Sequence, residues 1–521
     1  MTCLHKPVGV LVVLLFTFLP AVLFSQSLKA NWGQSSIDVP TFIQTDPSGN
    51  VFRTSFEDSL LVKMNADGHV LWSVGFPVQP NDSAAVVAGL AVDANGNSYV
   101  VGSYKTTHIN FGTTTLLANT SKGHNSLFLT TYDANGNFRW AITTAINSTA
   151  SVNAIKVNNN GEIFLTGDID TVTAIFGSTT LHSGVFHVKI NADKSIAWAK
   201  EIHSDDQISA GGMDVDHSGN SIVTGNFTGA TCSTNGTTLP NTNSATSDIF
   251  IIQFDTNGNV GLSQTDGTAA NNDWIRSMAI GASGSLYITG THEDHSLFIK
   301  AYDVDGNYAW ENPYYRSSSI YYSADLNVDG DENVYITGIF YGSEMDIDTV
   351  TLSVSGASNA LFAASFNKNG HLRWTGATDY SYGEHIVAGA GGKVYLTGSI
   401  ISPTLTLGSV VLTNRNSPNS NSGFLAQLNQ NNLTTGIFSS VASEQTALVY
   451  PNPTSGSTRF SGLKAAQWKL SIYSMNGISV YQTAFYASQV EVDLSAYPKG
   501  FYFYELQSDT EERAVGKISL E

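Results

Sequence analysis

The sequence predicts an all-β protein, a seven-bladed β-propeller of four-stranded blades followed by a small Ig-like β-sandwich. Three observations support this prediction. The 521 residues include 47 glycines and only 13% charged residues, a composition typical of turn-rich β proteins, and the length suggests more than one domain. Two kinds of Asp/Asn-Gly hairpin alternate along most of the chain. A separate group of short alternating strands follows them.

The repeating unit is clearest at Asp93–Trp140. It begins with the turn and strand DANGNSYVVG (Asp93–Gly102) and ends with LFLTTYDANGNFRW (Leu127–Trp140). Apolar residues flank both Asp/Asn-Gly turns, which is the strongest short-range signature of a β-hairpin. Asn and Gly tolerate the positive φ of such a turn, and the Asp side chain can bond the backbone amides ahead of it. One unit is therefore predicted to contain two hairpins, or four strands.

The two hairpin types alternate strictly and give seven units of roughly sixty residues, a period and strand content typical of a propeller. Six or eight blades are the alternatives. The first hairpin type recurs around Asp46, Asp93, Asn158, Asp216, Gly281, Asp329 and Ala388. The second recurs at Leu60–Trp72, Leu127–Trp140, Val185–Trp198, Ile249–Leu262, Leu297–Trp310, Leu361–Trp374 and, in degraded form, Gly423–Leu433.

The strand patterns agree with a ring of blades. A blade packs against a neighbour on both faces, so its middle strands should be apolar on both sides, as in IFIIQF (Ile249–Phe254). Small residues such as AGLAVD (Ala88–Asp93) suit innermost strands crowded around the axis. The Trp that ends most second hairpins is expected on the outer strand, packed against the next blade. Because the last unit lacks this Trp, we expect Trp32 in ANWGQS (Ala30–Ser35) to complete the seventh blade.

Units that read D-x-N-G-N-x-Y-(V/I)-T-G and then F-(I/V)-x-K-Y-D-x-N-G-N-x-x-W resemble the SBBP-like β-propeller repeats of secreted bacterial proteins. The resemblance covers residues 26–440, the predicted propeller domain. It implies the fold and an extracytoplasmic setting. The repeat family carries no fixed activity, so the resemblance transfers no catalytic residue.

Residues 1–25 are predicted to be a secretory signal peptide. His5 and Lys6 precede an apolar run, Val8–Phe24, and a polar segment begins after Ser25. The run is close to membrane-spanning length, so a retained anchor is the alternative. After signal removal we expect no membrane span.

Charge and cysteine content exclude several function classes. Lys and Arg number 24 against 43 Asp and Glu, and a net charge of −19 argues against a nucleic-acid partner. Much of the negative charge is turn Asp, which we interpret as a source of solubility. Cys3 lies within the predicted signal, so Cys232 alone cannot form an internal disulfide or a Cys-based zinc site. We interpret Cys232 as an unreactive bystander.

Residues 441–447 are predicted to be a polar linker, and residues 448–521 a small domain of short strands. The motifs YPNP, Y-x-x-x-G and L-x-x-Y-P-x-G-x-Y and a final strand with Lys closely resemble the C-terminal sorting domain of the type IX secretion system. The resemblance implies that the type IX machinery is a partner and that the chain reaches the medium or the outer cell surface of a Gram-negative bacterium. A generic Ig-like binding module is the alternative. The motif residues are Tyr450, Pro451, Asn452, Pro453, Gly477, Gly500 and Lys517.

In a four-stranded blade both hairpin turns lie on one face of the disc. The connections between blades, and from the second strand to the third, lie on the other face, which is where propellers usually bind ligands. The aromatic between-blade loop ENPYYRSSSIYY (Glu311–Tyr322), together with NDWIRS, suits stacking on sugars or peptide side chains, although packing between blades is the alternative. The predicted binding residues are Tyr314, Tyr315, Arg316, Tyr321, Tyr322, Trp274 and Arg276.

No cofactor is expected, but three segments are candidate metal sites, and calcium is possible at one of them. The loop THEDHS offers His292, Glu293, Asp294 and His295 as metal ligands, although a short exposed turn is often charged for solubility. The loop EIHSDD is a weaker case. Calcium at Asp325–Ile336 is disfavoured, because an EF-hand needs a carboxylate at the twelfth position and Ile336 stands there.

The sequence favours a non-catalytic propeller that binds a protein or a glycan through its variable-loop face. The alternative is a polysaccharide-active hydrolase or lyase with its site at the axis of the same face. An enzyme would gather carboxylates, His and Tyr in one deep axial pocket, for example Glu384 and His385 with acidic residues of other blades. The Arg residues are too scattered for a sialidase-type site, and no nucleophile, zincin or phosphate-loop motif is present.

Overall fold

A computed structural model describes the residues from 27 to 521 with internal gaps. The chain divides into two compact units, Met1–Ile437 and Phe438–Glu521, which are treated separately below. The predicted signal peptide (1–25) and linker (441–447) lie outside the described residues. The described ranges are 27–55, 60–76, 85–106, 108–117, 125–148, 150–170, 173–294, 296–314, 321–348, 350–354, 359–416, 420–430, 448–463, 467–474, 479–508 and 513–521.

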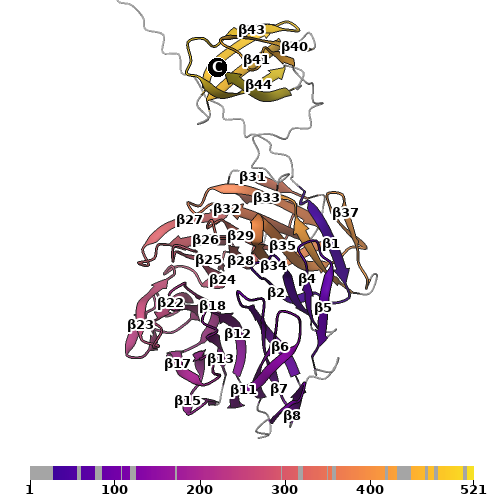
Figure 1. Ribbon diagram of the computed structural model, residues 1–521. Coiled ribbons are helices and arrows are strands. Elements are labelled where there is room, and N and C mark those ends of the chain that lie inside the picture. Colours follow the sequence, from indigo (N-terminus) through magenta and orange to yellow (C-terminus); the bar gives the residue numbers. More distant parts are fainter. Residues whose placement is uncertain are drawn as a thin grey trace, which may run out of the picture. The chain divides into compact units, whose positions relative to one another are not determined.

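The first unit consists of four-stranded antiparallel sheets, seven of them in the described ranges, which we number as blades 1 to 7 (Figure 1). The strands of each blade are given from the inside outwards. Blade 1 consists of β2 (Pro40–Thr45), β3 (Val51–Ser55), β4 (Leu60–Met64) and β5 (Val70–Gly75). Blade 2 consists of β6 (Ala85–Val92), β7 (Ser98–Tyr104), β10 (Asn125–Tyr132) and β11 (Phe138–Ser148), and blade 3 of β12 (Ala150–Val157), β13 (Ile163–Ile169), β16 (Gly184–Ile190) and β17 (Ile196–Ser204). Blade 4 consists of β18 (Ile208–Val215), β19 (Ser221–Phe227), β22 (Asp248–Phe254) and β23 (Val260–Asp266), and blade 5 of β24 (Asp273–Ile280), β25 (Leu286–His292), β26 (Leu297–Tyr302) and β27 (Tyr308–Tyr314). Blade 6 consists of β28 (Tyr321–Val328), β29 (Val334–Phe340), β32 (Ala360–Phe366) and β33 (Leu372–Asp379). Blade 7 consists of β34 (Ser381–Gly389), β35 (Lys393–Ile400), β38 (Ser422–Leu428) and β1 (Ala30–Ser36).

The blades form a closed ring. Each innermost strand contacts the innermost strand of the next blade, and β34 of blade 7 contacts β2 of blade 1 (Figure 1). Blade 7 takes its outermost strand from the other end of the unit, because β1 pairs with β38 and places Trp32 opposite Gln427. The expectation that the Trp32 segment completes the last blade is confirmed. We call this β1–β38 pairing the closing seam.

The Asp-Gly turns are held by their own side chains. In the inner turn of blade 2, Asp93 Oδ1 accepts the backbone N–H groups of Asn95 (2.9 Å) and Asn97 (2.8 Å), and Asp93 Oδ2 accepts the Asn97 amide at 2.7 Å. The same pattern recurs in the outer turn at Asp133. Hydrogen bonds from Asn137 hold the pKa of the Asp133 carboxyl below its usual value. These carboxylates therefore fasten turns, as the repeat of the motif predicts.

The outer-strand tryptophans join neighbouring blades. Trp72 of blade 1 lies over Gly136 in the outer turn of blade 2, where an added Cβ would sit 2.8 Å from the indole ring. Gly136 also has φ +83°, a conformation that other residues rarely adopt. Both the close indole ring and the backbone conformation therefore require glycine at this position. The Trp72 Nε1–H donates to Ala134 O of the same turn at 3.0 Å. This packing against the next blade is the arrangement that the sequence predicts.

Every innermost strand carries a β-bulge at the same height. In blade 7, for example, the register with β35 shifts between Gly383 and His385, so that Glu384 is the extra residue. Such a bulge bends the strand and redirects the side chains that follow it. The extra residues of the seven innermost strands in the described ranges are Thr41, Ala88, Asn153, Gly211, Arg276, Ala324 and Glu384.

The connections from second to third strand are more regular than the sequence predicts. Five blades in the described ranges place a short hairpin there, and those of blades 3 and 4 pair with the outermost strand of the preceding blade. The sequence predicts irregular, variable loops for these segments. The hairpins are β8 (His108–Phe111) with β9 (Thr114–Leu117), β14 (Ala174–Phe176) with β15 (Thr179–Leu181), β20 (Thr231–Thr234) with β21 (Thr237–Pro240), β30 (Glu344–Ile347) with β31 (Val350–Ser353), and β36 (Thr404–Leu407) with β37 (Val410–Thr413).

The second unit is a two-sheet sandwich around Trp468, Leu470 and Ile472, which are fully buried. Its three-stranded sheet consists of β39 (Leu448–Tyr450), β40 (Ser457–Ser461) and β43 (Val490–Asp493). Its four-stranded sheet consists, in spatial order, of β42 (Ser479–Tyr486), β41 (Gln467–Ser474), β44 (Gly500–Ser508) and β45 (Arg513–Leu520). A short 3-10 turn, η1 (Ala390–Gly392), follows β34 in the first unit.

Candidate functional site

A cavity of about 230 Å³ lies on the axis of the ring, lined by residues of all seven innermost strands. Its walls are formed by the two or three residues that follow each bulge and, in three strands, by the bulge residue itself, which is Asn153, Gly211 or Arg276. Small residues such as Gly89 and Gly212 leave space in the cavity. Four charged or titratable residues line its walls, which are Lys156, Arg276, Asp325 and His385. The bulges thus decide which side chains face the axis.

Asp325 connects three blades at this cavity. Its Oδ1 accepts the Ser277 hydroxyl of blade 5 at 2.9 Å, and its Oδ2 accepts the Ile386 N–H of blade 7 at 3.1 Å. Asp214 acts similarly, since it lies 3.1 Å from Lys156 Nζ of blade 3 and accepts the Ile280 N–H of blade 5. These carboxylates bond backbone N–H groups of the neighbouring innermost strands, and that is their structural role.

His385 is the titratable group between blades 6, 7 and 1. Its Nδ1 lies 3.5 Å from Asp325 Oδ2, and its ring lies 6.1 Å from the Phe42 ring of blade 1. Burial lowers the pKa of His385, but the hydrogen bond and charge of Asp325 and the charge of Glu384 outweigh burial and raise that pKa above its ordinary value. The imidazole is 32% exposed, so a ligand in the cavity can reach it.

A group of tyrosines lies at the loop-face ends of blades 6 and 7; we call Tyr322, Tyr341 and Tyr382 the tyrosine cluster. The Tyr322 and Tyr341 rings meet edge to face with centroids 6.2 Å apart. Asn359 donates to the Tyr382 hydroxyl at 2.7 Å. Burial, together with Tyr341 and Glu384 nearby, raises the pKa of Tyr382, which keeps its hydroxyl protonated.

Glu384 stands in the sequence next to His385, which lines the cavity, and two residues after Tyr382 of the tyrosine cluster. Burial raises the pKa of its carboxyl, against the opposing effects of His385 and of the Ser399 hydroxyl, which bonds it at 3.4 Å. Because it is the bulge residue between Tyr382 and His385, it lies in sequence between the two groups. The site therefore combines phenol edges, one carboxyl and one imidazole.

The structure brings together only part of the predicted binding set. Arg276 is exposed and lines the axial cavity, and Tyr322 belongs to the tyrosine cluster. Trp274 lies half-buried near the start of β24. Tyr314 ends β27 and Tyr321 begins β28, whereas Tyr315 and Arg316 lie outside the described residues.

The predicted metal ligands are engaged with protein groups. Buried His292 pairs through Nδ1 with the Asp273 carboxylate, and its Nε2 lies 4.0 Å from Glu311. Glu293 accepts the Asn272 amide at 3.0 Å, Asp294 accepts the Ser296 hydroxyl at 2.6 Å, and His295 lies outside the described residues.

Within the described part of the chain, no group of three or more His, Cys, Asp and Glu side chains could hold a metal ion. At the calcium candidate, Asp325 points to the axial contacts given above, while Asp329 bonds its own turn and the Tyr335 hydroxyl (2.8 Å). These two carboxylates therefore serve different parts of blade 6.

The YPNP motif of the second unit ties the first strand to the last. Asn452 donates its amide to Lys517 O at 2.6 Å and accepts the Ser519 N–H at 2.8 Å. Tyr450, Pro451 and Pro453 flank it, with Thr458 Oγ1 bonded to Pro451 O at 2.9 Å.

The other motif residues lie along the four-stranded sheet. Gly500 begins β44 with φ +147°, and Lys517 Nζ lies 4.0 Å from the centre of the Phe501 ring. Gly477 lies outside the described residues.

Of the axial group, the sequence points to His385 with acidic residues of other blades, but it does not single out Lys156, Asp214 and Asp325 as the neighbours of His385 at the axis. A signal was available, because an alignment of the seven units shows charged residues at these positions where blade 2 carries Gly89 and Ala91. What the alignment does not show is the bulge that turns them toward the axis.

Residues 448–521 match the family described as secretion system C-terminal sorting domain. The chain is therefore exported to the cell surface or beyond by the type IX secretion system, and its second unit is the sorting domain. In the described part of the chain no helix is long and apolar enough to cross a membrane.

Solved structures give remote likenesses. The Dos1 propeller is 9% identical with a TM-score of 0.39, over 72% of this chain and 75% of that one. A puromycin hydrolase is 13% identical with a TM-score of 0.39, over 75% and 54%. A gluconolactonase from Xanthomonas campestris is 12% identical with a TM-score of 0.31, over 61% and 95%.

These TM-scores are too low to carry an argument about function. None of the curated proteins compared with the chain matches it. The assignment of a propeller rests on the strand pairing described above.

Proposed function

We propose that the protein is a non-catalytic binding propeller of the outer cell surface, which holds a glycan chain through its variable-loop face. The observation that carries the proposal is that strand β34 carries both Tyr382 of the tyrosine cluster and His385, which lines the axial cavity with Arg276. Export by the type IX system supports it, because the chain is delivered to where extracellular glycans are met.

The chemistry of the group suits a sugar. Tyrosine offers an apolar ring with a polar edge at low conformational cost, and sugar rings have the same combination of apolar faces and hydroxyl groups. Arg276 can donate to ring or hydroxyl oxygens, and His385 and Glu384 can exchange hydrogen bonds with hydroxyl groups. A peptide ligand is the alternative, and it would use the same phenol rings.

The size of the cavity limits what enters it. At about 230 Å³ it is smaller than the range of about 300–1,000 Å³ of most small-molecule sites. A single sugar unit or a single side chain fits such a volume, and the rest of the ligand must lie across the loop-face ends of blades 6 and 7. We therefore infer recognition of a chain end or a branch.

The test is a glycan microarray probed with the secreted chain, beside Tyr382→Ala, Tyr322→Ala and the matched control Tyr380→Ala. Tyr380 is 43% exposed in the connection between blades 6 and 7, so it controls for loss of a surface phenol. We expect Tyr382→Ala and Tyr322→Ala to lose the signal and Tyr380→Ala to keep it. Binding that survives both cluster substitutions would contradict the proposal.

A second candidate is favoured by the contact between His385 and Asp325. A histidine held by a carboxylate is a common general base, and Glu384 with its raised pKa suits a general acid. The protein would then be a polysaccharide hydrolase or lyase. We rank it second because both Asp325 oxygens already bond neighbouring strands. The test is to incubate the protein with a panel of polysaccharides and to measure the reducing ends released. Release by the protein, but not by its His385→Ala variant, would establish that it is an enzyme.

A further inference from the structure

The junctions between blades follow a common plan on the turn face, the face opposite the variable loops. At four junctions an outer-strand Trp covers the glycine of the next outer turn and donates Nε1–H to a carbonyl of that turn. At several of them a long side chain of the third strand supports the contact. Lys63 Nζ, for example, reaches Ala134 O of the next blade at 3.2 Å.

The junction between blades 2 and 3 departs from this plan. Lys194, with φ +76°, stands where the other outer turns carry glycine, and its Nζ lies 5.5 Å from the centre of the Trp140 ring. In the described residues Trp140 Nε1 has no bond to that turn. The third strand offers only Thr131, whose buried Oγ1 has no hydrogen-bond partner in the described part of the chain.

The departure leaves a pocket of about 240 Å³. Its walls are the inner turns of blades 2 and 3, the exposed Arg139, the edge of Trp140 and the exposed Ala192. Amide side chains dominate the turn walls, where Asp93 is the one carboxylate beside Asn95, Asn97, Asn158, Asn159 and Asn160.

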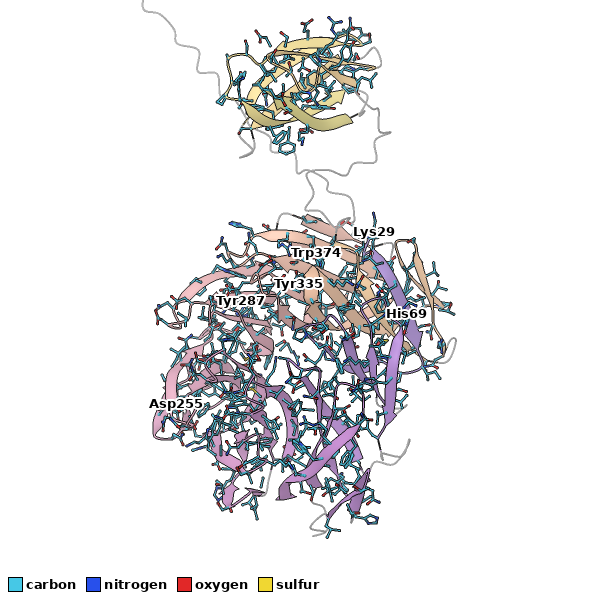
Figure 2. The ribbon with its side chains drawn as sticks, viewed as in Figure 1. Lys29, His69, Asp255, Tyr287, Tyr335 and Trp374 are labelled. Atoms are coloured by element: carbon cyan, nitrogen blue, oxygen red, sulfur yellow. The ribbon has the colours of Figure 1, made fainter. Side chains whose placement is uncertain are left out.

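The junction between blades 6 and 7 has similar residues to the junction between blades 2 and 3, but packs them differently. It also has a short third-strand residue, Ser365, and an outer-strand arginine, Arg373. There Arg373 Nη1 bonds the Tyr335 hydroxyl (3.2 Å) and Ser365 Oγ (3.0 Å), and Trp374 is buried beside Tyr335 (Figure 2). At the junction between blades 2 and 3, Arg139 likewise interacts with the Tyr99 hydroxyl. There, however, Arg139 is exposed and Trp140 half-buried, whereas Arg373 is half-buried and Trp374 buried.

We propose that the pocket between blades 2 and 3 is a second ligand site, and that it takes a neutral saccharide unit. Amides and a guanidinium supply donors and acceptors for hydroxyl pairs, and the edge of the Trp140 ring supplies an apolar contact for a sugar ring. Asp93 and Arg139 oppose each other in charge at the wall, so the pocket selects neither a cation nor an anion. It lies on the face opposite the tyrosine cluster, so one propeller can hold two saccharide chains.

The experiment is isothermal titration of the secreted chain with cellobiose, maltose, mannobiose and chitobiose. Ala192→Trp fills the pocket without removing a polar contact. Asn159→Ala removes one exposed amide and serves if the tryptophan variant fails to fold, which a thermal melt reports. We expect at least one disaccharide to bind, and both variants to weaken that binding by about tenfold or more.

Two controls separate this site from the proposed function. Arg373→Gln alters the packed counterpart at the junction of blades 6 and 7, and Tyr382→Ala alters the tyrosine cluster; neither should change disaccharide binding by more than about twofold. If no disaccharide of the panel binds, or if binding is unchanged by both Ala192→Trp and Asn159→Ala, the proposal is overturned. Loss of binding in Tyr382→Ala would assign the disaccharide to the loop face and overturn it equally.

Discussion

The carboxylate of Asp325 in blade 6 lies 3.5 Å from Nδ1 of His385 in blade 7, at the axis of the ring. The two residues are sixty positions apart in the sequence, one repeat unit. The contact joins neighbouring innermost strands and raises the pKa of the imidazole above 6.5 despite its burial.

Asp325→Asn should reveal this contact through its pH dependence. A raised folded-state pKa stabilises the protein fully below the ordinary His value, and the stabilisation is lost as pH rises through the folded pKa. The variant should therefore lose most stability below pH 6.5 and least at alkaline pH. Thermal melts from pH 5 to 9 measure this. Asn327→Ala removes a comparable but uncharged bond to the Ala388 N–H (2.9 Å), and its deficit should not vary with pH. Equal deficits of Asp325→Asn at both pH extremes would refute the ion pair.

His187 should dominate the acid sensitivity of blade 3. It is fully buried, bonded to Leu165 O and to the Ser221 hydroxyl, and burial lowers its pKa from 6.5 to about 3. A depressed pKa means that stability is present above pH 6.5 and is lost as pH falls toward 3, by up to about 1.4 kcal/mol per pH unit. In denaturant titrations at several pH values, His187→Gln should reduce the loss of unfolding free energy on acidification. His217→Gln, at an exposed turn, should leave that loss unchanged. If the unfolding free energies of the two variants depended on pH in the same way, another group would control the acid sensitivity of blade 3.

Trp32→Ala should open the ring at the closing seam. Trp32 covers Gly68 of blade 1 and donates to Ala66 O at 3.0 Å, so its loss should cost about 3 kcal/mol. We expect proteases to release the N-terminal strand from this variant before any other fragment appears. Trp72→Ala, an equivalent change away from the seam, should destabilise the ring without that early fragment. Early release in both variants would mean that the seam is no weaker point than any other junction.

Cys232 should be inert in the folded protein. It is fully buried, and burial raises the pKa of its thiol to about 12. In a chain with Cys3→Ser, an aromatic disulfide reagent should react with one thiol after denaturation and with none before. Rapid reaction of the native chain would disprove the interpretation of Cys232 as a bystander.

Asn452→Ala should loosen the sorting domain. The substitution leaves Lys517 O and the Ser519 N–H without their side-chain partner, at a cost of about 2 kcal/mol. Faster proteolysis of residues 448–521 in the intact chain measures it, and Ser455→Ala at an exposed neighbouring position serves as the control. A tail as resistant as that of the control would show that the YPNP motif matters for recognition alone.

The regular parts of the fold could be predicted because their physics is local. The Asp side chain of an Asp-Asn-Gly turn, such as Asp93, bonds the turn's own backbone and so fixes the hairpin. A Trp on an outer strand can bury its ring only against the next blade. The five connecting hairpins were not predicted, because segments such as HINFGTTTLL contain too few apolar residues to differ from loops. The grouping of Lys156, Asp214 and Asp325 with His385 at the axis could not be predicted, for another reason. A one-residue bulge before His385 changes the face of every side chain after it, and no feature of the sequence marks that bulge.

The pairing of Ala30 with Leu428 has a consequence for the order of folding. Strand β1 comes from the N-terminal end of the propeller, and its partner β38 comes from the C-terminal end. The closing seam cannot form before residues 30–428 are all available to fold. Closing of the ring is therefore a late step in folding, whatever the state of the other blades.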